Sequence, residues 1–195
     1  LILNKFASTF LSLNSFALLG QFQNLMNIGT AFSSGGIADG VVLFTTQYSN
    51  NKTAQQQFWK CGFAICALSS IITFILLILF SNWVRTILPN TISLPLFIII
   101  ASIGSFAGAL NILFLAIFNG LKLINKWTLG QIGMTCIQLC WWCTMIGFYQ
   151  FTGAIIAVLT QPILNLMWIL VIVNKIPEIS FEIFSSKMKS SNVLE

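Results

Sequence analysis

Five long apolar stretches, nearly free of charged side chains, restrict this chain to very few architectures. Each is close to or above the roughly 20 residues that an α-helix needs to cross the hydrocarbon core of a bilayer. The stretches are continuous and lack the alternation of barrel strands, so they favour helices over a β-barrel. The composition agrees, because 57% of the residues are hydrophobic and only 7% are charged. The sequence therefore predicts an all-α, polytopic transmembrane helix bundle.

Polar segments between these stretches set the limits of the predicted spans. The apolar residues 1–13 are expected to be the truncated end of a first helix, so the chain is expected to be a fragment. Five complete spans are predicted at residues 16–46, 61–80, 94–118, 128–149 and 153–173. Residues 1–173 then form one transmembrane lobe, and residues 174–195 a connector that carries an amphipathic helix at about residues 178–188.

Basic residues in the loops predict the orientation. If successive loops lie on opposite sides, one side holds Lys52, Lys60, Lys122, Lys126, Lys175, Lys187 and Lys189. The other side holds only Lys5 and Arg85, so the lysine-rich side is expected to be cytoplasmic, together with the connector. The net charge of +5 is attributed to this topology and to contact with anionic membrane lipids. No basic run is long enough to favour nucleic-acid binding. Tryptophans beside basic residues are expected at headgroup level: Trp59, Trp83 and Trp127.

One acidic residue, Asp39, lies inside the first complete span. If residues 21–46 form one continuous helix, an arc of about 60° holds Gln21, Asn24, Gly35, Asp39 and Thr46. A charged carboxylate in the bilayer centre costs at least about 2.5 kcal/mol, so Asp39 should face a water-filled cavity, pair with a cation or stay protonated. A neutral Asp39 that makes an interhelical hydrogen bond is the alternative. The glycines just before Asp39 permit a bend that would rotate this stripe.

Other polar or small residues in the spans have two interpretations each. Lys5 either extends its ammonium to the outer membrane interface or lines the same cavity as Asp39. Gly104 and Gly108 form a GxxxG pair, which favours close helix packing over ligand binding. Pro162 is expected to kink its helix, as in transporter helices that line a cavity. Gln161 and Asn165 lie four residues apart around Pro162, and Gln131 and Gln138 lie seven residues apart on the preceding span.

Residues for catalysis or metal binding are scarce. The chain has no histidine, which excludes a histidine base or a histidine zinc site in these residues. Cys136, Cys140 and Cys143 fall on one helical stripe, but we interpret them as small apolar residues rather than metal ligands. No enzyme activity, cofactor or metal is therefore predicted.

Residues 17–48, "ALLGQFQNLMNIGTAFSSGGIADGVVLFTTQY", resemble the second-helix signature of the Wzx-type O-antigen flippases. These belong to the multidrug/oligosaccharidyl-lipid/polysaccharide exporter superfamily. The matching residues are Gly20 to Asn24, Gly36 with Ile37, Gly40 to Val42, and Tyr48. Looser resemblance extends to "NKF" at residues 4–6 and "FNGLKLINKW" at residues 118–127. The chain departs from the family at Ser12 and Leu13, where Gly-Pro is common, and at Asp39, where Asn is common.

The resemblance implies the N-terminal six-helix lobe of a two-lobed transporter, with the C-terminal lobe missing from this chain. Its expected substrate is an undecaprenyl-pyrophosphate-linked oligosaccharide, flipped across the bacterial inner membrane by alternating access. Expected partners are this lipid-linked substrate, membrane lipids, and the polysaccharide polymerase and ligase machinery. The transport cavity is expected to include Lys5, Gln21, Asn24 and Asp39. An exporter of drugs or other lipid-linked substrates, or a scaffold subunit that transports nothing, are the alternatives.

Overall fold

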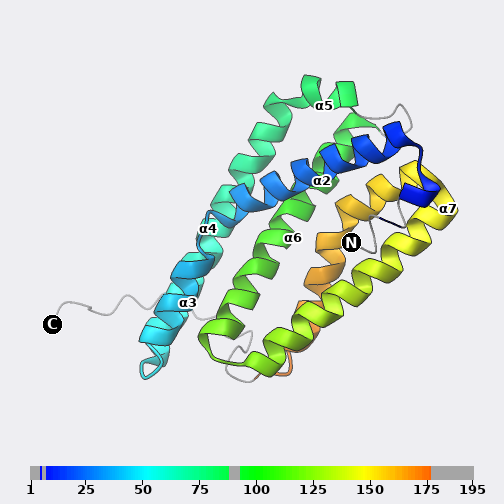
Figure 1. Ribbon diagram of the computed structural model, residues 1–195. Helices are drawn as coiled ribbons and strands as arrows, with labels where there is room; N and C mark the ends of the chain where they lie inside the picture. The colour runs from blue at the N-terminus through cyan, green and yellow to red at the C-terminus, as the bar shows by residue number, and fades with distance from the viewer. Residues whose placement is uncertain (1–4, 6–7, 88–92, 177–195) are drawn as a thin grey trace.

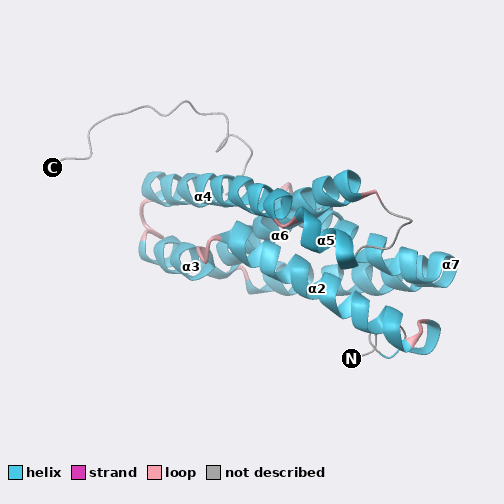
Figure 2. Ribbon diagram, turned by 90° about the horizontal axis from the view of Figure 1, so that it is seen from above, coloured by secondary structure: helices cyan, strands magenta, loops and turns pink. Residues whose placement is uncertain are grey.

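The described structure is built from helices and loops. The computed structural model describes residue 5, residues 8–87 and residues 93–176, and no strand occurs in these ranges (Figures 1 and 2). The helices are α2 (Leu13–Ser34), α3 (Ala38–Gln47), α4 (Lys52–Leu79), α5 (Ser81–Ile87), α6 (Leu94–Gly120) and α7 (Ile124–Val173). Within these ranges, four helical segments are long and apolar enough to cross a membrane: Leu13–Gln47, α4, α6 and α7. The predicted all-α class and the membrane-length apolar helices are confirmed.

The first predicted span is two helices instead of one. Gly35 and Gly36 separate α2 from α3 and have φ angles of 57° and 66°, in the left-handed region that glycine adopts without a steric penalty. The Gly35 amide donates to the carbonyl of Phe32 and ends α2. The assumption of one continuous helix over residues 21–46 is therefore wrong, and the arc that grouped Gln21 with Asp39 does not exist.

The last two predicted spans lie within α7, which folds back on itself. Gln150 has φ 47° and ψ −123°, so the backbone leaves the helical conformation there. The indole of Trp141 donates to Thr160 Oγ1 at 2.9 Å, and these residues lie on opposite sides of the break. The two limbs of α7, residues 124–149 and 151–173, therefore run antiparallel as a hairpin, seen in yellow and orange in Figure 1.

Helix α6 forms the centre of the bundle, between α4 and α7 (Figure 1). In its most apolar 18-residue stretch 61% of the residues are buried, compared with 22–33% in the other three segments. Large apolar side chains on the outer helices are exposed, such as Leu68 at 63% and Ile72 at 58% on α4. This distribution is typical of a membrane bundle, in which the outer faces meet lipid.

The loops after α3 and α6 and the end of α7 lie at the same end of the bundle (Figure 1). The lysines of these loops therefore gather at one end, as alternating loops require. That this end faces the cytoplasm stays a prediction. Trp59, however, is only 4% exposed, so its indole packs inside the bundle and does not face the membrane. Its predicted depth at headgroup level stays a prediction. The predicted connector from residue 177 onward, with its amphipathic helix, lies outside the described residues, as do residues 1–4, 6 and 7 of the predicted first helix.

Candidate functional site

A polar groove runs between α2, α6 and both limbs of α7, with a volume of about 540 Å³. We call it the amide groove, because its polar lining consists of side-chain amides and one hydroxyl: Gln23, Asn27, Thr30, Asn111, Gln138, Gln161 and Asn165. No charged side chain lines it. Apolar lining comes from residues such as Met26 and Trp142. The groove can therefore exchange hydrogen bonds with a neutral polar ligand on a partly apolar surface.

The amide groove lies about halfway along the helices. Gln138 and Gln161 stand near the midpoints of the two limbs of α7, about 15–20 Å from the limb ends at 1.5 Å per residue. Two apolar cores flank this level, one containing Phe22 and Trp142, the other Phe118 and Met134. In a membrane this depth corresponds to the hydrocarbon centre, where a row of amides is costly unless it faces water, protein or a ligand.

Hydrogen bonds fix part of the groove wall and leave other polar atoms unused. The Trp142 indole donates to Gln161 Oε1 at 2.8 Å, and the Asn111 amide donates to the Pro162 carbonyl at 2.9 Å. The side-chain oxygens of Asn111 and Asn165 are buried and accept no hydrogen bond from a described residue. A buried acceptor without a donor costs about 1–3 kcal/mol.

Two of the expected cavity residues lie outside the amide groove. Gln21 and Asn24 are exposed on the opposite face of α2, where they line an apolar cleft of about 700 Å³ with residues such as Phe32, Leu76 and Trp83. Residues three apart on a helix share a face, so these two stay together. They do not meet the groove residues.

Lys5 and Asp39 are also outside the amide groove, and both are exposed. The carbonyl of Lys5 accepts a hydrogen bond from the Ser8 hydroxyl at 2.8 Å, so Lys5 belongs to the start of the chain. That segment lies at the end of the bundle opposite α3, which carries Asp39 (Figure 1). The structure therefore does not bring Lys5 and Asp39 to one cavity.

The GxxxG glycines lie where helices approach closely. A Cβ atom on Gly104 would come within 2.7 Å of the Leu159 carbonyl oxygen on α7. One on Gly108 would come within 2.8 Å of the Thr30 side chain on α2. Both distances are too short for a real side chain, so these two glycines allow α6 to pack against the other groove helices.

Pro162 lines the amide groove, in the second limb of α7. Its backbone stays helical, and the non-helical residue of α7 is Gln150. Proline has no amide hydrogen, so the ordinary helical bond to the carbonyl of Val158 cannot form. Asn111 reaches the carbonyl of Pro162 itself, which ties α6 to α7 at this point.

The groove residues that the sequence interpretation missed are Gln23, Asn27 and Thr30. Their separations of four and three residues place them on one face of α2. This stripe was available in the sequence, beside the competing stripe of Gln21 and Asn24. The sequence interpretation chose Gln21 and Asn24 because one continuous helix would have placed them on the same face as the charged Asp39.

Soft metal ligands do not gather in the described residues. No group of three histidine, cysteine or acidic side chains there is arranged to hold a metal ion. Cys136, Cys140 and Cys143 are free and exposed on the first limb of α7.

Comparisons with known proteins find no matching family model, no similar curated protein and no similar solved structure.

Proposed function

We propose that the chain forms the N-terminal lobe of a two-lobed flippase for undecaprenyl-pyrophosphate-linked oligosaccharides in the bacterial inner membrane. In this proposal the lobe has six spans, and the substrate moves between the leaflets by alternating access, in partnership with polysaccharide polymerase and ligase machinery. The observation that carries the proposal is the amide groove, a polar and uncharged surface at mid-depth in apolar helices.

The chemistry of the amide groove suits the sugar part of such a substrate. Each glutamine or asparagine side chain offers both donors and an acceptor, as sugar hydroxyls do. Indole and methionine side chains in the same lining, Trp142 and Met134, provide apolar contact for the faces of sugar rings. A groove without charges binds a neutral saccharide without requiring a counter-ion.

Helix α2 separates this groove from the apolar cleft on its other face. The cleft lies between α2, α4 and α5, and its lining is apolar apart from residues such as Gln21, Asn24 and Thr73. An amphiphile has a polar head and an apolar chain, and the two faces of α2 match these two parts. We assign the groove to the saccharide and the cleft to part of the lipid chain.

Asp39 has a separate role in this proposal. Its side chain is exposed on α3 and lies outside the groove. An ionised carboxylate facing lipid would cost at least about 2.5 kcal/mol, so we place this face toward the second lobe and its aqueous pathway. Asp39 then serves as an ion-coupling group and not as a saccharide ligand.

The proposal is tested with groove variants of the full-length protein in cells that depend on it for surface polysaccharide. Gln138→Leu and Asn165→Leu remove groove hydrogen bonds at similar side-chain size. We expect the amount of surface polysaccharide to fall about tenfold or more, since a lost hydrogen bond that leaves polar partners buried costs about 1–3 kcal/mol.

Gln131→Leu is the matched control, because Gln131 is exposed on the same limb of α7 and does not line the groove. It should leave polysaccharide display unchanged. All three variants should be present in the membrane at the level of the parent protein. Normal display by both groove variants would overturn the proposal.

A further inference from the structure

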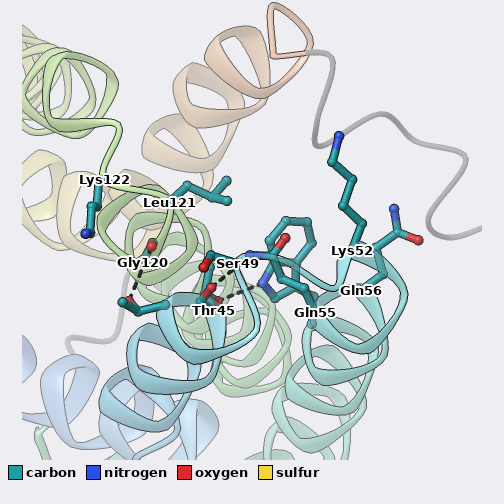
Figure 3. A pocket seen from close by; sticks show the side chains of 10 residues that line it. Thr45, Ser49, Lys52, Gln55, Gln56, Gly120, Leu121 and Lys122 are labelled. Atoms are coloured by element: carbon teal, nitrogen blue, oxygen red, sulfur yellow. Dashed lines mark hydrogen bonds between the residues drawn. The ribbon is translucent and has the colours of Figure 1, made fainter.

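A second cavity opens at the loop end of the bundle, between the α3–α4 turn and the α6–α7 turn (Figure 3). Its volume is about 230 Å³, many times what one water molecule needs. We call it the basic pocket, because two lysines, Lys52 and Lys122, line it from different loops. Thr46, Ser49 and Gln56 add polar side chains to the same wall.

The floor of the basic pocket is held by hydrogen bonds between three helices. Thr45, which is 1% exposed, accepts from the Trp59 indole at 2.9 Å and from the Gln55 amide at 2.8 Å. The Thr46 hydroxyl shares its one hydrogen between the carbonyls of Val42 at 2.8 Å and Gly120 at 3.3 Å, and the second contact joins α3 to α6. These contacts fix α3, α4 and α6 relative to one another, and the pocket between them is preformed.

Both lysines occupy positions that local structure disfavours. Lys52 is the first residue of α4, at the positive end of the helix dipole, and the first turn contains no acid. Lys122 has a φ of 57°, a left-handed conformation in which glycine or asparagine is usual. Residues that break local rules and line one cavity from opposite sides, as Lys52 and Lys122 do in Figure 3, suggest a ligand that compensates for them.

The described part of the chain offers no internal counter-ion for these two ammonium groups. Asp39 is its one acidic residue, and it does not line the basic pocket. Lysine ammonium groups, hydroxyls and free amides at a helix N-terminus are together the donors that bind phosphate. The pocket also lies at the ends of the membrane-length helices α4 and α6, at the level of lipid headgroups.

We propose that the basic pocket is a binding site for a phosphate group, with Lys52 and Lys122 as its cationic ligands. The phosphate belongs either to an anionic phospholipid headgroup or to free inorganic phosphate. This site is distinct from the amide groove, and its existence does not depend on what the groove transports. Lysines that only orient the protein in the membrane would need neither a shared cavity nor its fixed floor.

The test measures thermal stabilisation of the full chain in neutral detergent at about 0.15 M salt, where the screening length is about 8 Å. The probes are phosphatidylglycerol, diacylglycerol with the same acyl chains, and inorganic phosphate. We expect a phosphate-bearing probe to raise the melting temperature of the parent chain. Lys52→Gln and Lys122→Gln should each raise the half-saturating concentration about tenfold, the effect of losing a charged hydrogen bond.

Two further variants separate binding from folding. Lys126→Gln removes a nearby lysine, in the first turn of α7, that does not line the pocket, so it should bind like the parent chain. Lys122→Gly relieves the left-handed conformation and should raise the melting temperature without ligand, yet weaken binding as Lys122→Gln does. That combination would show that Lys122 serves the ligand and not the fold.

The source of the phosphate follows from the probes. Protection by phosphatidylglycerol alone identifies a lipid headgroup, whereas equal lysine-dependent protection by inorganic phosphate identifies the free anion. Equal protection by diacylglycerol, or an unchanged response in Lys52→Gln and Lys122→Gln, would overturn the site. An equal loss in Lys126→Gln would also overturn it, because it would show diffuse surface attraction.

Discussion

At the scale of single residues, two glycines decide how closely α6 approaches its neighbours. Gly104 and Gly108 have no room for a Cβ atom, whereas Gly20 on α2 has no atom within 4 Å of its ideal Cβ position. All three residues are helical. The same change of glycine to alanine therefore has opposite consequences at the two kinds of position.

We predict that Gly104→Ala lowers the free energy of unfolding by about 1–3 kcal/mol, because the added methyl group meets the Leu159 backbone. Gly20→Ala should raise it by about 0.4–1 kcal/mol, because alanine restricts the unfolded chain at no steric cost. Denaturant titration in mild detergent measures both values. A Gly104→Ala variant as stable as Gly20→Ala would contradict the close approach of α6 and α7.

Asp39 supports a second prediction at this scale. Asp39→Asn keeps the size and hydrogen-bonding capacity of the side chain and removes its ionisable group. If Asp39 is the coupling group, the variant reaches the membrane at the normal level but displays less surface polysaccharide and loses pH dependence of transport. Asp39→Leu, the harsher control, should also lower the amount of protein. Full display with an unchanged pH response in Asp39→Asn would make Asp39 a polar packing residue.

At the scale of elements, the break at Gln150 divides α7 into the two antiparallel limbs of a hairpin. Gln150 occupies a backbone conformation that is common only for glycine. Hydrogen bonds from Trp141 to Thr160 and from Trp142 to Gln161 hold the two limbs together about three helical turns from this break. The turn is therefore maintained by the packing of the limbs and not by the preference of Gln150.

Gln150→Gly should raise the free energy of unfolding by about 1–3 kcal/mol, the usual cost of such a conformation in a residue with a side chain. Gln131→Gly is the matched control in the helical part of the same limb, and it should lower stability by about 0.5–1 kcal/mol. Thermal unfolding of both variants in detergent gives the sign of each effect. Destabilisation by both changes would mean that Gln150 does not sit in a left-handed turn.

Hydropathy predicted the approximate positions of the long apolar helical segments better than it predicted where each helix begins and ends. The span predicted at residues 94–118 corresponds closely to α6 (Leu94–Gly120), because its polar flanks coincide with its helix caps. In contrast, α4 begins at Lys52, nine residues before the predicted span, since the polar turn capped by Asn51 is helical but not apolar. The short helix α5 was missed, because seven residues cannot cross a bilayer.

At the scale of the whole molecule, the candidate site depends on which helix faces meet. The sequence contained the groove amides, including Gln138, Gln161 and Asn165, and each pair was noted on its own helix. Phe22 and Met26 pack into the core beside α6, and this packing sets the rotation of α2. Helix α2 therefore turns Gln23 and Asn27 toward the groove, and Gln21 and Asn24 away from it. A single sequence does not specify that rotation, because both faces of α2 carry amides.

If the lobe transports a saccharide, the amide groove is a water-accessible pathway inside an otherwise apolar bundle. The most direct measurement is thiol labelling in membrane vesicles of both orientations, with the native cysteines replaced and single cysteines introduced by Gln138→Cys, Asn165→Cys and Gln131→Cys. We expect an impermeant, polar thiol reagent to label the first two variants more strongly than Gln131→Cys, whose side chain is exposed but does not line the groove. Unreactive groove variants in both vesicle orientations, or equally strong labelling of all three, would contradict this pathway.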